Sequence, residues 1–236
     1  MLEHTNFREK RKRRPKRNGA FANTNCAEYI IKNLHLSREK ICRKGLCSAG
    51  ERDRIKPEKH FRETTMEQIG LLHLYYGDGK GKTTAAMGLA LRALGSGKRV
   101  VIVQFLKGGR SGEIPLLEQL GAKVYRGKAG QKFVFQMNEA EKAATRQLQN
   151  QNLTAAMAEP ADLLVLDEAG SAWELDMVDK DLLRQAVLQR PAGQECVLTA
   201  HAAPQWMLDA ADYVTEMQCI RHPYQKGIAA RRGIEY

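Results

Sequence analysis

From residue 66 onward, short and continuous apolar runs alternate with longer stretches in which apolar residues recur every three or four positions. The runs have strand length and carry few polar residues, as expected for parallel strands that are buried on both faces. The longer stretches predict the helices that connect them. The predicted strands are 69–76, 99–105, 122–126, 162–167, 195–199 and 213–217, and the predicted helices are 83–94, 114–120, 138–159, 179–189 and 204–211.

This alternation predicts an α/β fold, in which helices cover both faces of a mostly parallel sheet. Residues 1–65 lack the pattern. The segment from Arg8 to Arg17 reads REKRKRRPKR, a block of like charges that repels itself and is expected to be disordered when alone. We therefore divide the chain into a basic, flexible N-terminal extension, 1–65, and a folded domain, 66–236.

Charge and composition exclude several classes of protein. No apolar run approaches the roughly 20 residues that a membrane-spanning helix needs, and the basic N-terminus has no apolar stretch after it, so no secretory signal is expected. The chain has five cysteines, an odd number, and none forms a C-x-x-C pair. This pattern is typical of reduced thiols, so we expect a cytoplasmic protein.

The basic charge is concentrated in the extension. Residues 1–65 hold 18 Lys and Arg against 8 Asp and Glu, whereas the remaining residues hold 20 against 19. The folded domain is therefore nearly neutral, and its charge gives no reason to expect that it binds nucleic acid.

A phosphate-binding loop is predicted between the first strand and the first helix. Its residues are Gly77, Asp78, Gly79, Lys80, Gly81, Lys82, Thr83 and Thr84. The glycines allow backbone N–H groups to face an anion, and the helix start adds the positive end of its dipole. Lys82 would reach phosphate oxygens, and the Thr83 hydroxyl would bind Mg²⁺. Tyr76 stands where the common P-loop pattern has its first glycine, so an ordinary nucleotide pose is not assumed.

The fourth predicted strand ends in two acids, Asp167 and Glu168, after the apolar run LLVL. Ligands of open α/β sheets bind at the carboxyl ends of the strands, so these carboxylates are candidate Mg²⁺ ligands. Together with the P-loop they indicate binding of ATP or GTP. They do not specify the reaction, because P-loop domains serve kinases, NTPases and other transferases.

Residues 66–236 resemble the P-loop type of ATP:cob(I)alamin adenosyltransferase, the corrinoid adenosyltransferases. The resemblance lies in an ordered set of blocks: GDGKGKTTAA from Gly77, VQFLKG from Val103, the Asp167-Glu168 strand end, and RHPY from Arg221 with GIEY at the end. It implies a RecA-like P-loop fold. The family, like this chain, lacks the first P-loop glycine.

The resemblance also implies the chemistry. In this family the cobalt of cob(I)alamin attacks C5′ of ATP, which lies reversed relative to kinases, and triphosphate leaves. Lys82, Thr83 and Glu168 would then be catalytic, and Thr83, Asp167 and Glu168 would hold Mg²⁺. The resemblance further implies a homodimer and a reducing flavoprotein as partner.

Two aromatic residues of the family displace the lower axial ligand of cobalamin. Phe133 matches the family's phenylalanine, whereas Phe135 stands where tryptophan is typical. In an extended segment the two rings would point the same way, and an ordinary core pair is the alternative. His201 stands where the family usually has arginine, and 169–173 also departs from the family pattern.

Two other functions stay open at this stage. The chain could be a P-loop phosphotransferase or NTPase with a ligand that is not a corrinoid, which would release diphosphate instead of triphosphate. It could also be a nucleic-acid-binding protein that uses its basic arm, in which case binding would fall steeply with salt.

Overall fold

The computed structural model describes residues 69–130 and 132–236. The extension predicted over 1–65 lies outside the described residues. Within them, six strands form one sheet in which every neighbouring pair runs parallel. The strands are β1 (Leu72–Tyr76), β2 (Val100–Gln104), β3 (Lys123–Arg126), β4 (Leu163–Asp167), β5 (Glu195–Ala200) and β6 (Tyr213–Glu216). The α/β fold predicted from the sequence is therefore confirmed.

The order of the strands across the sheet is β3-β2-β4-β5-β1-β6. One strand, β5, lies between β1, which leads into the P-loop, and β4, which ends in the two acids. All carboxyl ends lie at one edge because the strands are parallel, so residues that follow β1, β2, β4 and β5 meet there. This is the arrangement of a RecA-like P-loop fold.

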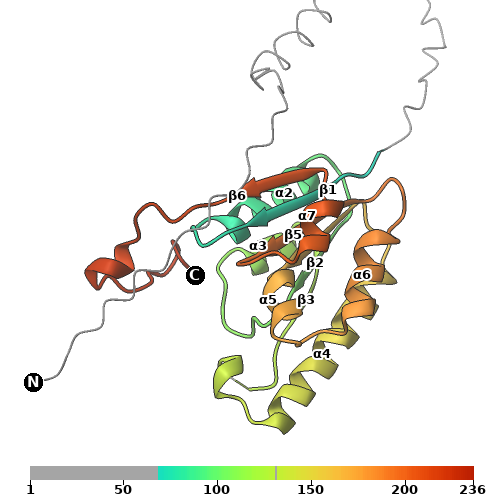
Figure 1. Ribbon diagram of the computed structural model, residues 1–236. Coiled ribbons are helices and arrows are strands. Elements are labelled where there is room, and N and C mark those ends of the chain that lie inside the picture. Colours follow the sequence, from blue (N-terminus) through green and yellow to red (C-terminus); the bar gives the residue numbers. More distant parts are fainter. Residues whose placement is uncertain (1–68, 131) are drawn as a thin grey trace, which may run out of the picture. The chain divides into compact units, whose positions relative to one another are not determined.

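Helices cover both faces of the sheet (Figure 1). On one face lie α2 (Lys82–Gly95) and α3 (Ile114–Gln119), and on the other lie α4 (Glu139–Met157), α5 (Ala169–Glu174), α6 (Lys180–Leu188) and α7 (Gln205–Ala210). Alternate residues of β4 enter the two cores: Leu163 and Val165 pack on the α2 side, and Leu164 and Leu166 on the α4 side. All four are buried, which explains why the strand is apolar throughout.

Two segments differ from the prediction. Helix α5 was not predicted, because neither a capping side chain nor a proline marks its start, whereas the equally short α3 and α7 carry Pro115 and Pro204 at theirs. The long helix predicted to run to Glu159 ends at Met157. Glu159 instead accepts hydrogen bonds from the Tyr125 hydroxyl, at 2.8 Å, and from the Lys123 ammonium, which ties the end of α4 to β3.

Within the described ranges, no helix is both long and apolar enough to cross a bilayer.

The starts of β2 and β4 are joined by Asp162 and Arg99. Asp162 accepts hydrogen bonds from the Arg99 backbone N–H at 2.8 Å, Nε at 3.1 Å and Nη2 at 2.8 Å. These bonds favour the ionised carboxylate and lower the pKa of Asp162 from 3.8 to about 2. A depressed pKa means that the pair stabilises the fold above the ordinary pKa and loses this contribution as the carboxylate is protonated.

We therefore expect Asp162→Asn to lower the urea midpoint at pH 7, because the substitution removes the charge that Arg99 pairs with. The difference from the wild type should shrink as the pH falls from about 4 to about 2. Urea unfolding at pH 7, 4 and 2.5 measures this. A midpoint difference that stays constant across the three pH values would contradict the assignment.

Candidate active site

The loop between β1 and α2 is held against the C-terminal part of the chain. Gly77 and Gly81 have positive φ angles of 113° and 117°, a region that glycine adopts without strain. A Cβ on Gly77 or Gly79 would lie 2.4 or 2.7 Å from the backbone oxygen of Met217. The glycines are therefore needed for the close approach of a second backbone segment as well as for the turn.

This packing changes which amides face a ligand. The Gly79 N–H donates to the Met217 carbonyl at 2.7 Å, and the Gly77 N–H donates to the carbonyls of Ala200 and His201. The sequence predicted that the loop amides as a group would bind phosphate, whereas these two are used within the protein. Helix α2 begins at Lys82 without a side-chain cap, so its first amides supply the positive end for an anion.

Two predicted loop residues turn toward the C-terminal segment. The Asp78 carboxylate accepts from the Cys219 backbone N–H at 2.9 Å, and Lys80 Nζ contacts the Ile234 carbonyl at 3.5 Å. Glu235 beside it has its pKa lowered to about 2, chiefly by hydrogen bonds from Arg231 and to a smaller extent by Lys80. In this structure the side chains of Asp78 and Lys80 therefore brace the last residues.

Lys82 folds back over its own loop and donates to the Gly79 carbonyl at 2.7 Å. The half-buried ammonium is held by a neutral acceptor. A phosphate oxygen would be a stronger acceptor, because it carries charge.

Asp167 is the centre of the site at the carboxyl edge. Its side chain is fully buried. Oδ1 accepts from the hydroxyls of Thr83 and Thr199, both at 2.8 Å, and Oδ2 accepts from Gln104 Nε2 at 3.1 Å and Lys107 Nζ at 2.6 Å. The predicted pair of Thr83 and Asp167 is therefore brought together, with three further donors.

Gln104, Lys107 and Thr199 were not predicted as site residues. Gln104 and Thr199 lie at the carboxyl ends of β2 and β5, the two strands that flank β4, and Lys107 follows β2. The strand order brings them to Asp167, and that order is not visible in a pattern of apolar runs. The sequence offered two signals, a polar residue at the end of an apolar strand and the VQFLKG block, which contains Gln104 and Lys107.

Glu168 has a left-handed backbone, with φ at 63°. Its N–H donates to the Thr199 hydroxyl at 2.7 Å, and its carboxylate accepts from Ser171 Oγ at 2.8 Å. A glutamate in this region is uncommon and is held there by its neighbours. The conformation directs the Glu168 carboxylate to the same edge, with Oε1 lying 3.8 Å from Lys107 Nζ.

The residues present fit a magnesium ion. Thr83, Asp167 and Glu168 offer only oxygen ligands, the type that Mg²⁺ prefers. The Oε1 atom of Gln104, on the amide that contacts Asp167, is buried and has no hydrogen-bond partner among residues 69–130 and 132–236, so an ion-bound water is a suitable donor for it. No cluster of three or more His, Cys, Asp or Glu occurs in the same ranges, so nucleotide and water would supply the remaining ligands.

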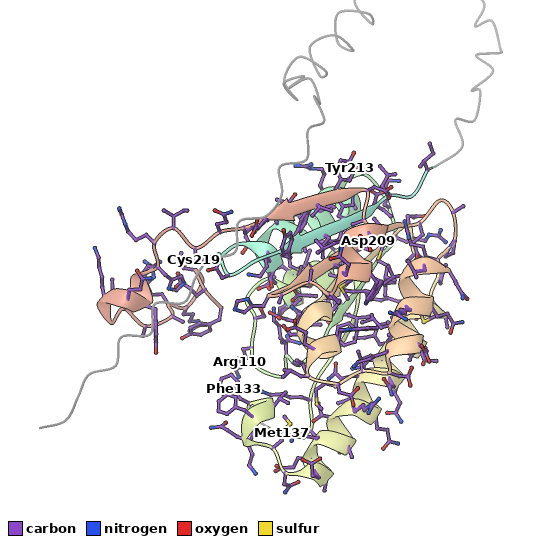
Figure 2. All side chains as sticks on the ribbon, viewed as in Figure 1. Arg110, Phe133, Met137, Asp209, Tyr213 and Cys219 are labelled. Carbon is purple, nitrogen blue, oxygen red and sulfur yellow. The ribbon has the colours of Figure 1, made fainter. Side chains whose placement is uncertain are left out.

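Phe133 and Phe135 form an exposed pair. Their rings stack with centroids 5.6 Å apart and planes 6° from parallel, and the Lys128 ammonium lies 5.3 Å from the Phe133 ring. The side chains are 64% and 83% exposed, so the core alternative was wrong. The segment is not extended, because Val134–Gln136 is a 3₁₀ turn, closed by a hydrogen bond from the Gln136 N–H to the Phe133 carbonyl at 2.8 Å. The Phe133 N–H donates to Gln136 Oε1 at 3.1 Å and caps the turn. Phe133 lies at the surface in Figure 2, and the buried Met137 beside it.

The aromatic pair and the P-loop follow strands on opposite sides of β4, the strand that ends at Asp167. The pair follows β3, which is four strand positions from β1. At about 4.8 Å a position, the two strands are about 19 Å apart. A ligand that contacts both regions must therefore extend across the carboxyl edge of the sheet.

His201 lies beside the P-loop, at the carboxyl end of β5. It lines an open hollow of about 690 Å³ together with Tyr76, Gly77, Asp78, Ala202, Ala203, Glu216, Gln218, Cys219 and Ile220. The His201 side chain is exposed, whereas its carbonyl accepts the Gly77 N–H at 3.1 Å. The backbone of His201 thus shapes the loop, and the residue also lines the hollow.

The sequence matches a known protein family over most of its length. The family profile of ATP:corrinoid adenosyltransferase BtuR/CobO/CobP matches residues 68–236. The corrinoid adenosyltransferase CobA of Salmonella typhimurium is 36% identical over 172 residues, which cover 72% of this chain and 87% of that protein. The corrinoid adenosyltransferase of Pseudomonas aeruginosa is 32% identical over 173 residues, with 72% and 85% covered.

A solved structure, a family 4 carbohydrate esterase from Streptomyces lividans, aligns over 60% of this chain and 83% of that chain. Its TM-score is 0.21 and its identity 19%, values too low to indicate a shared fold. The family profile covers most of the chain, and it includes the P-loop, the Asp167 site and the exposed phenylalanine pair. This chain therefore belongs to the ATP:corrinoid adenosyltransferase family.

Proposed function

We propose that this protein transfers the 5′-deoxyadenosyl group of ATP to the cobalt of reduced cob(I)alamin, or of a related corrinoid. Cobalt donates its electron pair to C5′, the bond from C5′ to oxygen breaks, and triphosphate leaves with the bonding electrons. The observation that carries the proposal is the joining of Thr83, Asp167 and Glu168 beside the P-loop, in a chain that belongs to this family.

The phosphates are the leaving group in this reaction, so the P-loop stabilises charge that develops on them. The first amides of α2 and the Lys82 ammonium would bind the triphosphate. Thr83, Asp167 and Glu168 would hold Mg²⁺, which supplies further positive charge to the phosphates when bound. Asp167 keeps Thr83 oriented through the 2.8 Å hydrogen bond between them.

The separation of the two halves of the site supports the proposal. The P-loop and the hollow beside His201 suit ATP, and the exposed aromatic pair across the edge offers an apolar surface to a large planar substrate. A kinase that transfers a phosphoryl group to a small acceptor does not need this second surface.

The direct test uses the purified full chain with ATP, Mg²⁺ and chemically reduced cobalamin. We expect the visible spectrum to change to that of adenosylcobalamin, with one triphosphate released for each corrinoid modified. Release of diphosphate without a change in the corrinoid spectrum would favour the alternative of a P-loop phosphotransferase or NTPase.

We further propose that the protein acts in the cytoplasm as a homodimer and receives reduced corrinoid from a flavoprotein. The proposal for the cytoplasm rests on Cys196 and Cys219, which are free thiols. Residues 1–65 are proposed to be a separate extension, because the family match begins at residue 68. Nucleic-acid binding is not favoured as the function of the chain, since the family match assigns residues 68–236 to an adenosyltransferase family.

Phe133→Ala and Phe135→Ala should reduce turnover of cob(II)alamin with its reductant more than turnover of cob(I)alamin. The expected reason is that only cob(II)alamin still needs its lower axial ligand displaced by the aromatic pair. Thermal unfolding should change little, because exposed substitutions stay within about 0.5 kcal/mol. The measurement is turnover of both substrates by each variant, with melting curves.

Leu116→Ala is a matched control, because Leu116 is an apolar residue of α3 that is 61% exposed. It should change neither substrate's turnover. Phe135→Trp restores the family's usual residue and should hold or improve cob(II)alamin turnover. Equal losses on both substrates in the alanine variants would rule out a role in displacing the ligand.

A further inference from the structure

Lys107 is directed into the candidate metal site by the backbone. The residue before it, Leu106, has a left-handed conformation with φ at 59°. The Lys107 carbonyl accepts the Gly127 N–H at 3.1 Å, which fixes the turn against the end of β3. A leucine in this region is strained, and such strain is stored where a turn must aim a neighbouring group.

The ammonium of Lys107 contacts all three residues proposed to bind Mg²⁺. Nζ lies 2.6 Å from Asp167 Oδ2, 3.0 Å from Thr83 Oγ1 and 3.8 Å from Glu168 Oε1. The Thr83 hydroxyl donates to Asp167 and accepts from Lys107. One positive charge therefore takes up the oxygen atoms that a divalent cation would need.

We propose that Lys107 is a tethered cation that competes with the divalent metal for Asp167, Thr83 and Glu168. The inference rests on the metal role given to these residues under the proposed function. Without Lys107, two adjacent carboxylates would lie at the edge of the sheet, one of them buried, and would attract cations from solution. The ammonium balances this charge, so the free protein does not bind a divalent ion tightly.

Bound nucleotide changes the competition between the Lys107 ammonium and Mg²⁺ for these oxygen atoms. The phosphates bring negative charge and further oxygen ligands, so Mg²⁺ gains partners that the free protein lacks. The flexible Lys107 side chain, 29% exposed, leaves Asp167 and pairs with the phosphates instead. Metal and nucleotide then bind together, and the displaced ammonium adds a second positive charge, besides Lys82, beside the triphosphate.

The test measures binding of Mn²⁺ to the nucleotide-free full chain, by the loss of the EPR signal of free Mn²⁺. Mn²⁺ takes the same oxygen ligands as Mg²⁺. Lys107→Met should bind one Mn²⁺ at least about tenfold more tightly than the wild type, and Mn²⁺ should raise its melting temperature more. Adding Asp167→Asn to Lys107→Met should abolish the gain, because it removes the carboxylate in contact.

Lys123→Met is the control for net charge. Lys123 is the first residue of β3, at the end of the strand away from the carboxyl edge, and it pairs with Glu159. This control variant should leave Mn²⁺ affinity at the wild-type value. Lys107→Arg keeps the positive charge, so its Mn²⁺ affinity should stay as weak as that of the wild type. Lys107→Gln is the substitute neutral variant if Lys107→Met does not fold. Equal affinity in wild type and both neutral variants, or a gain that survives Asp167→Asn, would overturn the proposal. Adenosylation by the wild type is scored separately, so failure of the proposed function is seen independently.

Discussion

Lys82→Ala is expected to lower adenosylation by at least about a hundredfold at saturating ATP. The reason is that Lys82 is the P-loop cation, and loss of one preorganised group that stabilises developing charge costs about 10² to 10³ in rate. Among the described residues its ammonium donates to the Gly79 carbonyl alone, a neutral acceptor that phosphate easily replaces. The loss should appear in kcat, because charge grows on the triphosphate as the bond to C5′ breaks.

The matched control is Lys123→Ala, which removes an exposed lysine of β3 with its own partner in Glu159. It should leave kcat within about twofold of the wild type. Both variants should unfold at similar temperatures. Near-normal turnover by Lys82→Ala at saturating ATP would refute the role given to this lysine and, with it, the reading of the loop as the triphosphate site.

Gly170→Ala should destabilise the fold, whereas Gly88→Ala should stabilise it, although both add one methyl group to a helix. A Cβ on Gly170 would lie 2.3 Å from the Ala200 Cβ and 2.7 Å from the Ala202 carbonyl oxygen, where α5 packs on the end of β5. Overpacking of this kind costs about 1–3 kcal/mol. Gly88 is exposed on α2, and apart from the backbone of its own helix no atom of the described residues lies within 4 Å of the added group, so its replacement should gain about 0.5–1 kcal/mol.

Chemical unfolding of the two variants and the wild type measures the difference in the free energy of unfolding. Gly170→Ala should also shift the loop that carries His201, because the added methyl group would collide with Ala200 and Ala202, the residues on either side of His201. ATP affinity should therefore fall in Gly170→Ala and stay unchanged in Gly88→Ala. Equal free energies of unfolding in the two variants would contradict the predicted clash, because they would show that α5 moves away from β5 at no cost.

The parallel sheet was predictable because its strands are buried on both faces. Val165 and Leu166 enter different cores, and such strands read as continuous apolar runs. Helix α5 was not predictable, since no capping side chain or proline marks its start, whereas Pro115 and Pro204 mark the equally short α3 and α7. The turn around Phe135 was not predictable either, since a single 3₁₀ turn has no period to detect.

The candidate site was predicted in part. Thr83, Asp167 and Glu168 stand in local motifs, so the sequence alone marks them. Gln104 and Lys107 reach Asp167 because β2 and β4 are neighbours in the sheet, although 63 and 60 residues separate them from it. Strand order is a property of the whole fold, and a motif does not contain it.

The packing of Met217 on the P-loop has a consequence for biosynthesis. Asp78 and Cys219, which join the loop to the segment after β6, are 141 residues apart in the chain. During synthesis the Gly-Lys-Thr motif therefore leaves the ribosome long before the segment after β6 that packs on the P-loop. We expect stalled nascent chains that end before residue 213 to lack ATP binding in a filter assay, and chains that expose residue 236 to acquire it. Contacts of such long range also slow folding, so β1 stays without its neighbouring strands while the rest of the chain is synthesised. The exposed β1 of the nascent chain is therefore a suitable segment for a chaperone to bind.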